Sequence, residues 1–477
     1  MRGFRIQDLG FRTRKFGVRS SEFGVNSKMF GVRGSEFGAG STMAASFSLV
    51  RIAVFMIGLT LLVGCGGGSS FVNTNPVPPT PVANSVTVNV NSGPANNAVN
   101  FAYVSVSLCN TGGTATCVTI PDVQVDTGSS GLRILASAPG VSSLALTPVT
   151  GGGSSVYECD QFAGGTYLWG QVVQAGVKMA GETATNVPIQ IISSDAAPAS
   201  VASNCNPLGG NNLGTPAALQ ANGILGVGTS IADCGTGCTG SSVLPLYWLC
   251  SNATTCTTPA AIPIATQVSN PVAFFGSDNN GVVLTLGTVA PSGAATATGT
   301  LLFGNGTQTD NAIPSSAKVY ALGASVIGTQ VYLTILAAYN GNTYPAFIDS
   351  SQTTNIFLDS GTVAAASAGA GITSCTQYPV LYCTGSGASL PVTMEDSHSD
   401  SAQITLPVGD GATLLNSSVT NGGSNAAFGN LTGGYALGAS DYVDLGLPFF
   451  YGRSVFVGIS GEVPPTGVSA PLGYWAF

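Results

Sequence analysis

From residue 85 onward, apolar and polar residues alternate in short runs that are separated by turn residues. Valines alternate with Thr87 and Asn89 over residues 86–90, and residues 103–108 repeat the pattern. A period of two residues is typical of half-buried strands. Asn-Gly pairs between the runs indicate tight turns, and no long stretch has the period of an amphipathic helix. The pattern therefore predicts an all-β chain.

The first 84 residues lack this strand pattern. Residues 1–42 contain a near repeat of the tetrapeptides Phe-Gly-Val-Arg and Ser-Glu-Phe-Gly. We expect this stretch to lie upstream of the true start of the protein at Met43, because the features of a signal peptide begin there. A genuine basic extension is the alternative.

Residues 43–65 carry these features. Arg51 precedes an apolar run over residues 52–63, which is too short to span a bilayer comfortably. The run ends in Leu-Val-Gly before Cys65, and this arrangement resembles a bacterial lipoprotein signal peptide with its lipobox. The resemblance implies cleavage before Cys65 and attachment of lipid to its thiol. A simple signal peptide and a short membrane anchor are the alternatives.

The residues after Cys65 extend the lipoprotein interpretation. Residues 66–84 are rich in Gly and Ser and then in Pro, which is typical of a flexible linker that becomes extended. Such a linker would hold a soluble domain away from the membrane on a lipid anchor. Gly66 is not the acidic residue that retains lipoproteins in the inner membrane. We therefore expect an exported protein of the cell envelope, attached to the outer membrane.

Composition narrows the range of functions. Charged residues make up only 7% of the 477 residues, and the part after Cys65 holds 18 acidic but only four basic residues. Nucleic acid is thus excluded as an expected partner, because nothing in this part could neutralise phosphates. The only histidine is His398, in a polar run interpreted as a solvated loop, so zinc sites with several histidines are excluded. The length is enough for two lobes.

Ten cysteines remain once Cys65 is set aside, an even number that fits disulfides in an exported protein. Short spacings suggest four local pairs, and the two remaining cysteines would then pair by default. The predicted pairs are Cys109 with Cys117, Cys234 with Cys238, Cys250 with Cys256, Cys375 with Cys383, and Cys159 with Cys205.

Residues 123–132 hold the main candidate for chemistry. A short apolar strand ends at Asp126 and is followed by Thr127, Gly128 and Ser129. Gly128 has no Cβ, so backbone can approach the carboxylate, and the two hydroxyls can hydrogen-bond around it. The stretch resembles the catalytic loop of pepsin-like aspartic proteases. This resemblance implies two lobes whose facing aspartates share a proton and activate a water molecule.

Two lobes of this kind would divide the chain into residues 85–310 and 311–477. Residues 222–228, Asn-Gly-Ile-Leu-Gly-Val-Gly, resemble the strand that crosses beside the first catalytic loop in pepsins. Residues 444–450, Asp-Leu-Gly-Leu-Pro-Phe-Phe, look like its counterpart in the second lobe. The fold implied is all-β, two-lobed and pepsin-like.

Residues 162–181 resemble the flap hairpin that bends over the cleft of pepsins. Glycines lie near the expected tip, and Tyr167 and Trp169 follow it. Either aromatic side chain could close over a substrate, and either could pack inward instead. Both are therefore candidate substrate-binding residues.

Two aspartates compete for the second loop. Asp359 lies in Asp-Ser-Gly-Thr, which keeps the local pattern, whereas Asp349 is followed by Ser350 and has lost the glycine. Spacing favours Asp349. The first aspartate precedes Gly226 of its crossing strand by 100 positions, and Asp349 precedes the corresponding Gly446 by 97, whereas Asp359 precedes it by 87. We therefore expect Asp349 to be the second acid, supported by Ser350, with Asp359 as the alternative.

Residues 85–477 also resemble an uncharacterised family of bacterial lipoproteins. The shared features are Asp-Thr-Gly-Ser-Ser-Gly-Leu, a second segment that begins Phe-Ile-Asp-Ser, and a closing Gly-Leu-Pro-Phe-Phe-x-Gly-Arg-x-Val. In this chain they lie at 126–132, 347–350 and 446–455. That family has no assigned reaction, so the resemblance supports the fold and not an activity.

Three residues depart from the pepsin pattern. Ser351 replaces the glycine of the second loop, where a strained backbone could cost about 1–3 kcal/mol, and Gln352 replaces a hydroxyl residue. Arg133 stands where pepsins place a tryptophan that braces the flap. A cation there would disturb the sharing of a proton by the two acids.

Two functions therefore remain open. The first is an aspartic endopeptidase that cleaves extended peptides with Asp126 and either Asp349 or Asp359, without a metal or organic cofactor. The second is a catalytically inactive binding or structural protein of the cell surface with the same fold. We expect a monomer in either case.

Overall fold

The computed structural model describes residues 83–477, apart from 113–115, 163–164, 208, 241–242, 253, 329, 397–399 and 436–441. The upstream extension, the signal peptide with Cys65, the linker up to residue 82, and His398 therefore lie outside the described residues. In the described part no helix is both long and apolar enough to cross a membrane.

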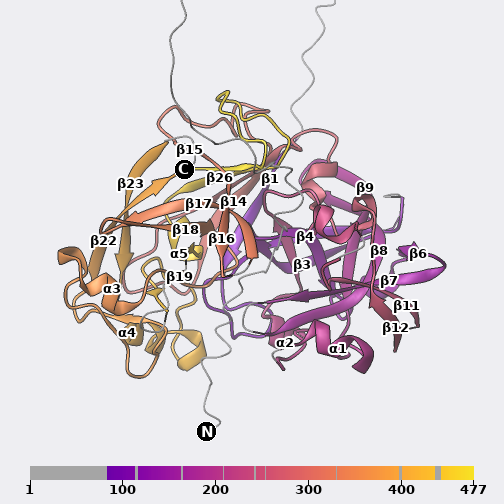
Figure 1. Cartoon of the computed structure of the whole chain (residues 1–477), viewed down its shortest axis with the longest axis horizontal. Coiled ribbons are helices and arrows are strands. Elements are labelled where there is room, and N and C mark those ends of the chain that lie inside the picture. The colour runs from indigo at the N-terminus through magenta and orange to yellow at the C-terminus, as the bar shows by residue number, and fades with distance from the viewer. Residues whose placement is uncertain are drawn as a thin grey trace, which may run out of the picture. The chain divides into compact units, whose positions relative to one another are not determined.

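Nearly all regular structure in the described part is β, in two large sheets (Figure 1). The sheets have 17 and eight strands, and the described helices have at most seven residues. The prediction of an all-β, two-lobed chain is confirmed. The helices are α1 (Ala199–Cys205), α2 (Pro216–Leu219), α3 (Ser360–Ala364), α4 (Gly411–Asn416) and α5 (Leu447–Phe450).

The larger sheet takes most of its strands from the first lobe. It contains β1 (Ser85–Val90), β2 (Ala102–Cys109), β3 (Cys117–Asp126), β4 (Ser130–Leu135), β5 (Thr147–Pro148), β6 (Thr150–Gly151), β7 (Ser154–Gln161), β8 (Tyr167–Met179), β9 (Glu182–Ile192), β10 (Gly223–Val227), β11 (Tyr247–Asn252), β12 (Thr255–Pro259), β13 (Gly281–Leu286), β14 (Ala297–Phe303), β15 (Val319–Ala321), β26 (Ser454–Gly458) and β27 (Tyr474–Ala476).

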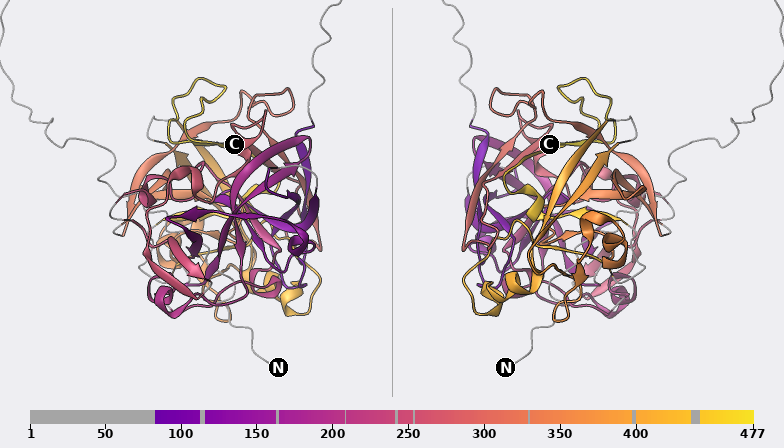
Figure 2. Two further views of the ribbon diagram at one scale, coloured as in Figure 1. Left: turned by 90° about the vertical axis from the view of Figure 1, so that its right-hand side faces the viewer. Right: turned by 90° about the vertical axis from the view of Figure 1, so that its left-hand side faces the viewer.

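The smaller sheet comes from the second lobe alone. It contains β16 (Gly323–Ile327), β17 (Gln330–Tyr339), β18 (Asn342–Ile348), β19 (Asn355–Ile356), β22 (Ala388–Glu395), β23 (Ser401–Val408), β24 (Thr432–Gly433) and β25 (Val443–Leu445). Strands β20 (Thr373–Ser374) and β21 (Tyr382–Cys383) form a separate pair. Figure 2 shows the strands of the two lobes from opposite sides.

The last strands of the chain return to the larger sheet. Strand β26 pairs with β13, and β27 pairs with both β15 and β26. Strand β1 pairs with β14, so the segment around residues 281–303 is held from both sides. The sheets therefore do not divide the chain at a single position. The expected boundary at 310 falls in a loop between two strands of the same sheet.

Each lobe contains the same arrangement of three strands. In the first, β10 runs parallel to β3 and antiparallel to β4. In the second, β25 runs parallel to β18 and antiparallel to β19. The expectation that residues 222–228 cross beside the first aspartate loop is confirmed, because Gly226 is paired with Asp126. The repeat places the end of β3 and the end of β18 in equivalent positions.

All ten cysteines of the described part form disulfides. The bonds join Cys109 to Cys117, Cys159 to Cys205, Cys234 to Cys238, Cys250 to Cys256 and Cys375 to Cys383. The predicted pairing is therefore confirmed. Each bond lies within one lobe.

Candidate functional site

The first loop holds its carboxylate at the end of β3. Asp126 is buried, with 3% of its surface exposed. The backbone N–H of Gly128 donates to Asp126 Oδ1 at 2.9 Å, and the Ser129 hydroxyl donates to Oδ2. The loop thus binds this carboxylate through its own backbone and hydroxyl groups, as the residue types in the sequence had indicated.

The second loop follows β18. Asp349 is 5% exposed, and its carboxyl Oδ1 accepts a hydrogen bond of 2.8 Å from the backbone N–H of Ser351. The backbone N–H of Asp349 donates to Leu445 O of β25 at 2.9 Å. Asp349 therefore occupies in the second lobe the place that Asp126 occupies in the first.

Reciprocal hydrogen bonds join the two loops. The Thr127 hydroxyl donates to Ile348 O at 2.9 Å and accepts from the Ser350 N–H at 2.9 Å. In return, the Ser350 hydroxyl donates to Val125 O at 2.8 Å and accepts from the Thr127 N–H at 3.1 Å. Each hydroxyl thus binds the backbone of the opposite loop on both sides. The exchange is nearly symmetric and holds the two loops face to face.

Gly128 makes a close approach that only glycine permits. A Cβ atom at Gly128 would lie 2.6 Å from Asp349 Oδ2 and 2.8 Å from Oδ1. The carboxyl group of Asp349 therefore rests directly on the backbone of the first loop. The structure brings Asp126, Gly128 and Asp349 into one group, in which both aspartates are buried.

Asp359 lies elsewhere and caps a helix. Its Oδ1 accepts hydrogen bonds from the N–H groups of Gly361 and Thr362, at 3.0 and 3.1 Å. The Thr362 hydroxyl donates to its Oδ2 at 2.6 Å. Asp359 is thus the N-cap of α3. The Asp-Ser-Gly-Thr pattern around Asp359 matches a helix start as well as it matches a catalytic loop.

Ser351, which replaces the glycine of the second loop, is buried and fits without displacing the loop. Its N–H and its side chain both hydrogen-bond to Asp349. These bonds lower the pKa of Asp349, but burial and the charges of Asp126 and Asp444 outweigh them. The pKa of Asp349 lies well above its usual range as a result.

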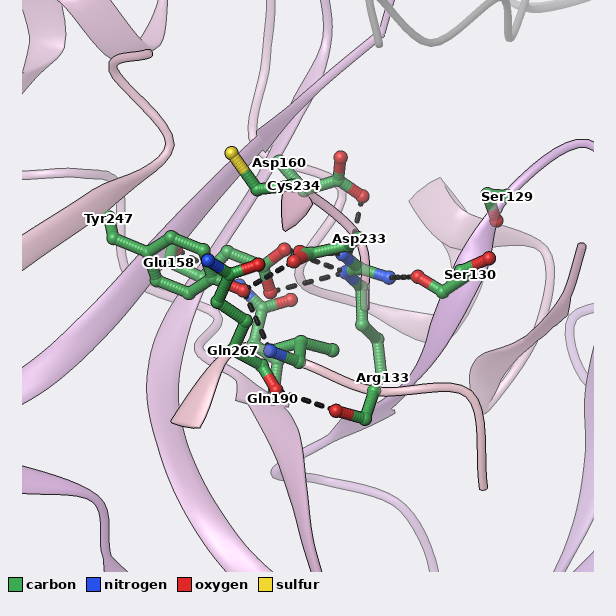
Figure 3. Close-up of polar contacts among 12 residues, drawn as sticks. Ser129, Ser130, Arg133, Glu158, Asp160, Gln190, Asp233, Cys234, Tyr247 and Gln267 are labelled. Atoms are coloured by element: carbon green, nitrogen blue, oxygen red, sulfur yellow. Dashed lines mark hydrogen bonds and ion pairs between the residues drawn. The ribbon is translucent and has the colours of Figure 1, made fainter. Parts of the chain in front are cut away.

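Arg133 belongs to a separate buried cluster (Figure 3). Its guanidinium binds Glu158 through Nε at 3.1 Å, Asp233 through Nη2 at 2.8 Å and Asp160 through Nε at 3.3 Å. Nη1 donates to Ser130 O at 3.1 Å, next to the first aspartate loop. Arg133 is therefore surrounded by Glu158, Asp233 and Asp160. The sequence had suggested instead that its charge disturbs the aspartate pair.

Burial dominates the electrostatics of this cluster. It raises the pKa of Glu158 well above the usual range and also raises that of Asp233. Burial alone would lower the pKa of Arg133, but the charges of Asp160, Glu158 and Asp233 raise it. One cation cannot neutralise three carboxylates, so the cluster retains at least one proton on its acids.

The predicted flap is a hairpin of β7 and β8 that is built into the sheet. Strand β7 also pairs with β11, and Cys159 of β7 is bonded to Cys205 of α1. Tyr167 and Trp169 are 4% and 2% exposed. Trp169 stacks on Tyr157 with ring centroids 5.2 Å apart. The sequence left open whether Tyr167 and Trp169 close over a substrate or pack inward, and both side chains pack inward.

Comparison with known proteins identifies the family of this chain. Residues 80–477 match the model of a family described as "Protein of unknown function (DUF3443)". The chain belongs to this family. No curated protein matches the sequence. Among solved structures, an aspartic proteinase from Irpex lacteus is similar with 13% identity and a TM-score of 0.46, and the match covers 83% of this chain and 97% of that one.

One acid of this DUF3443 member was missed as a candidate functional residue. Asp444 of β25 is 1% exposed, and burial followed by the charge of Asp126 raises its pKa to about 7. The sequence segment 444–450 was identified only as a crossing strand, and alternation with Val443 and Leu445 would place the Asp444 side chain in solvent.

Proposed function

We propose that this protein is an aspartic-type endopeptidase that uses Asp126 and Asp349. The observation that carries the proposal is the exchange of hydrogen bonds between Thr127 and Ser350, with Asp349 resting on Gly128. Two buried carboxyls held face to face repel each other as anions, so they share a proton. A pair of this kind can act as base and acid in one step.

The mechanism follows from the different environments of the two acids. Asp126 accepts hydrogen bonds from Gly128 and Ser129 and acts as the base that takes a proton from water. Asp349, with its raised pKa, carries the shared proton and gives it to the carbonyl oxygen of the peptide. Water oxygen bonds to the carbonyl carbon. Asp126 then returns its proton to the leaving amine as the C–N bond breaks, and Asp349 recovers its proton from the diol.

The alternative is an inactive binding or structural protein. Two observations favour it: Asp126 and Asp349 are only 3% and 5% exposed, and the β7–β8 hairpin is joined to β11 and α1. For the proposed reaction, a peptide carbonyl and a water molecule must reach both of these largely buried carboxyls.

We also propose that the protein is exported and tethered to the outer membrane through lipid on Cys65. Five disulfides support an oxidising compartment. Metabolic labelling with a radioactive fatty acid in a bacterial host tests the tether. Label should enter the wild-type protein and not a Cys65→Ala variant, and equal labelling of both would contradict the proposal.

The catalytic proposal is tested by cleavage of labelled, unfolded casein by the purified protein between about pH 3 and 7, where shared-proton pairs work. Asp126→Asn and Asp349→Asn should each abolish cleavage. Asp359→Asn is the matched control, because asparagine caps helices as well as aspartate does, and it should retain cleavage. Wild-type protein that is folded but inactive throughout this range would favour the binding protein.

A further inference from the structure

Asp444 lies beside Asp349 on the neighbouring strand. In the parallel pairing of β25 with β18, Asp444 is opposite Phe347, two positions before Asp349. Side chains at paired positions and at every second position share one face of a sheet. The carboxyl of Asp444 therefore emerges on the face that carries Asp349.

The first lobe shows that the fold does not require an acid at this position. Ile224 pairs with Gln124, two positions before Asp126, just as Asp444 pairs with Phe347. Ile224 is fully buried and apolar. An apolar side chain thus satisfies the packing of the first lobe, whereas the second lobe buries a carboxyl in the same place.

Few interactions offset the cost of burying the carboxyl of Asp444. Its Oδ1 is buried and accepts no hydrogen bond from the residues that the structure describes, and the interaction with Gln352 lowers its pKa less than burial raises it. The negative charge of Asp126 contributes to the raised pKa of Asp444, and that of Asp444 contributes to the raised pKa of Asp349. Arg133, the buried cation of the first lobe, binds three other acids. The like charges of Asp126, Asp349 and Asp444 favour a state in which at least one of these three carboxyls keeps a proton.

We propose that Asp444 is a third carboxyl group of the site, whose charge extends the pH range in which Asp126 and Asp349 share a proton. The role rests on the proposed function, and Asp444 acts through Asp349 without touching the substrate. When Asp444 is neutral it adds no charge to the pair. When it ionises, its negative charge makes removal of the shared proton harder, so the pair keeps that proton to higher pH.

Two substitutions remove this charge. Asp444→Asn keeps the size of the side chain. Asp444→Ile introduces the isoleucine that the first lobe has at the equivalent position. Asp195→Asn is the control, because Asp195 is an exposed acid. The rate of casein cleavage by the purified protein is measured from acidic pH to well above the pKa of about 7 at which Asp444 ionises. In both Asp444 variants the alkaline limb should move to lower pH by about one unit, while the acidic limb and the control stay unchanged.

A second measurement reads the proton of Asp444 without using activity. A carboxyl whose pKa is higher in the folded protein stabilises the fold below its unfolded pKa and loses that contribution as pH rises through the folded value. For Asp444 this window extends from 3.8 to about 7. Denaturant unfolding at pH 4 and pH 8 should therefore show that the wild type loses more stability than Asp444→Ile over this interval.

The two measurements separate failure of this inference from failure of the proposed function. If the wild type cleaves casein and the alkaline limb is the same in both Asp444 variants, the third carboxyl has no effect on the pair and the inference is overturned. If the wild type cleaves nothing, the proposed function fails, and the unfolding measurement alone decides whether Asp444 carries the proton. Equal loss of stability in wild type and Asp444→Ile would overturn the inference in that case as well.

Discussion

The two aspartate loops exchange the same hydrogen bonds, yet the buried charge around them is arranged differently in the two lobes. On the three central strands of the first lobe, the residues in register are Gln124, Ile224 and Arg133. The corresponding residues of the second lobe are Phe347, Asp444 and Ile356. The first lobe thus buries a cation on one outer strand, and the second buries an acid on the central strand.

This difference distinguishes the residues that the fold requires from the residues that are particular to one lobe. The contacts of Thr127 and Ser350 are equivalent across the two loops, which indicates that they hold the loops in place. Arg133 and Asp444 have no equivalents across the lobes, and apolar side chains replace each of them in the other lobe. Their charges therefore serve something other than packing, and substitution at equivalent positions can measure what they contribute.

The largest effect is expected from Arg133→Met. The substitution leaves Glu158, Asp160 and Asp233 buried without their cation, which should lower the free energy of unfolding by about 3–5 kcal/mol at neutral pH. The loss should be smaller at pH 4, because burial raises the pKa of Glu158 and Asp233 and favours their protonated forms. Denaturant unfolding at both pH values measures it. The matched control is Ile356→Met at the equivalent position of the second lobe, which should cost much less. Similar losses from the two substitutions would contradict the assigned role of the cluster.

An intermediate effect is expected from breaking the exchange between the loops. Thr127→Val and Ser350→Ala each leave buried backbone groups without partners and should each cost about 1–3 kcal/mol. Because the two pairs of bonds hold the same two loops together, the double variant should cost less than the sum. The exposed hydroxyl pair of Ser107 and Thr119, 3.1 Å apart, offers a control cycle. Additive losses at Thr127 and Ser350 would show that the loops are not coupled.

The smallest effect is expected at Asp359. Asp359→Ala removes the cap of α3 and should lower stability by about 1 kcal/mol, whereas Asp359→Asn should cost less. Thermal unfolding can resolve the two. A loss of several kcal/mol from Asp359→Asn would mean that the carboxylate does more than cap a helix.

Local patterns in the sequence were enough to predict the class, the disulfides and the first loop. Alternation of apolar residues indicated strands, because side chains of a strand point to opposite faces in turn. Short cysteine spacings indicated the pairs, because residues across a hairpin are close in space. The choice between Asp349 and Asp359 needed more than local pattern, since both follow apolar residues. Only distance along the chain separated them.

Sequence reasoning could not anticipate features that depend on register and on distant pairing. Asp444 stands between Val443 and Leu445, and an alternating segment of this kind predicts that its polar residue faces solvent. It is buried because β25 lies between β18 and β19. The partners of Arg133 come from segments 25 to 100 residues away along the chain. No pattern within one strand contains that information.

The pairing of β26 with β13 also bears on how the protein is made. Strand β13 is translated about 170 residues before its partner, since their registers join Val282 to Val457. Until then one side of β13 presents free backbone donors and acceptors, which attract strands of other chains. A polypeptide truncated before Ser454 would keep that side open permanently. An interrupted molecule therefore differs from a finished one by an open sheet edge at β13.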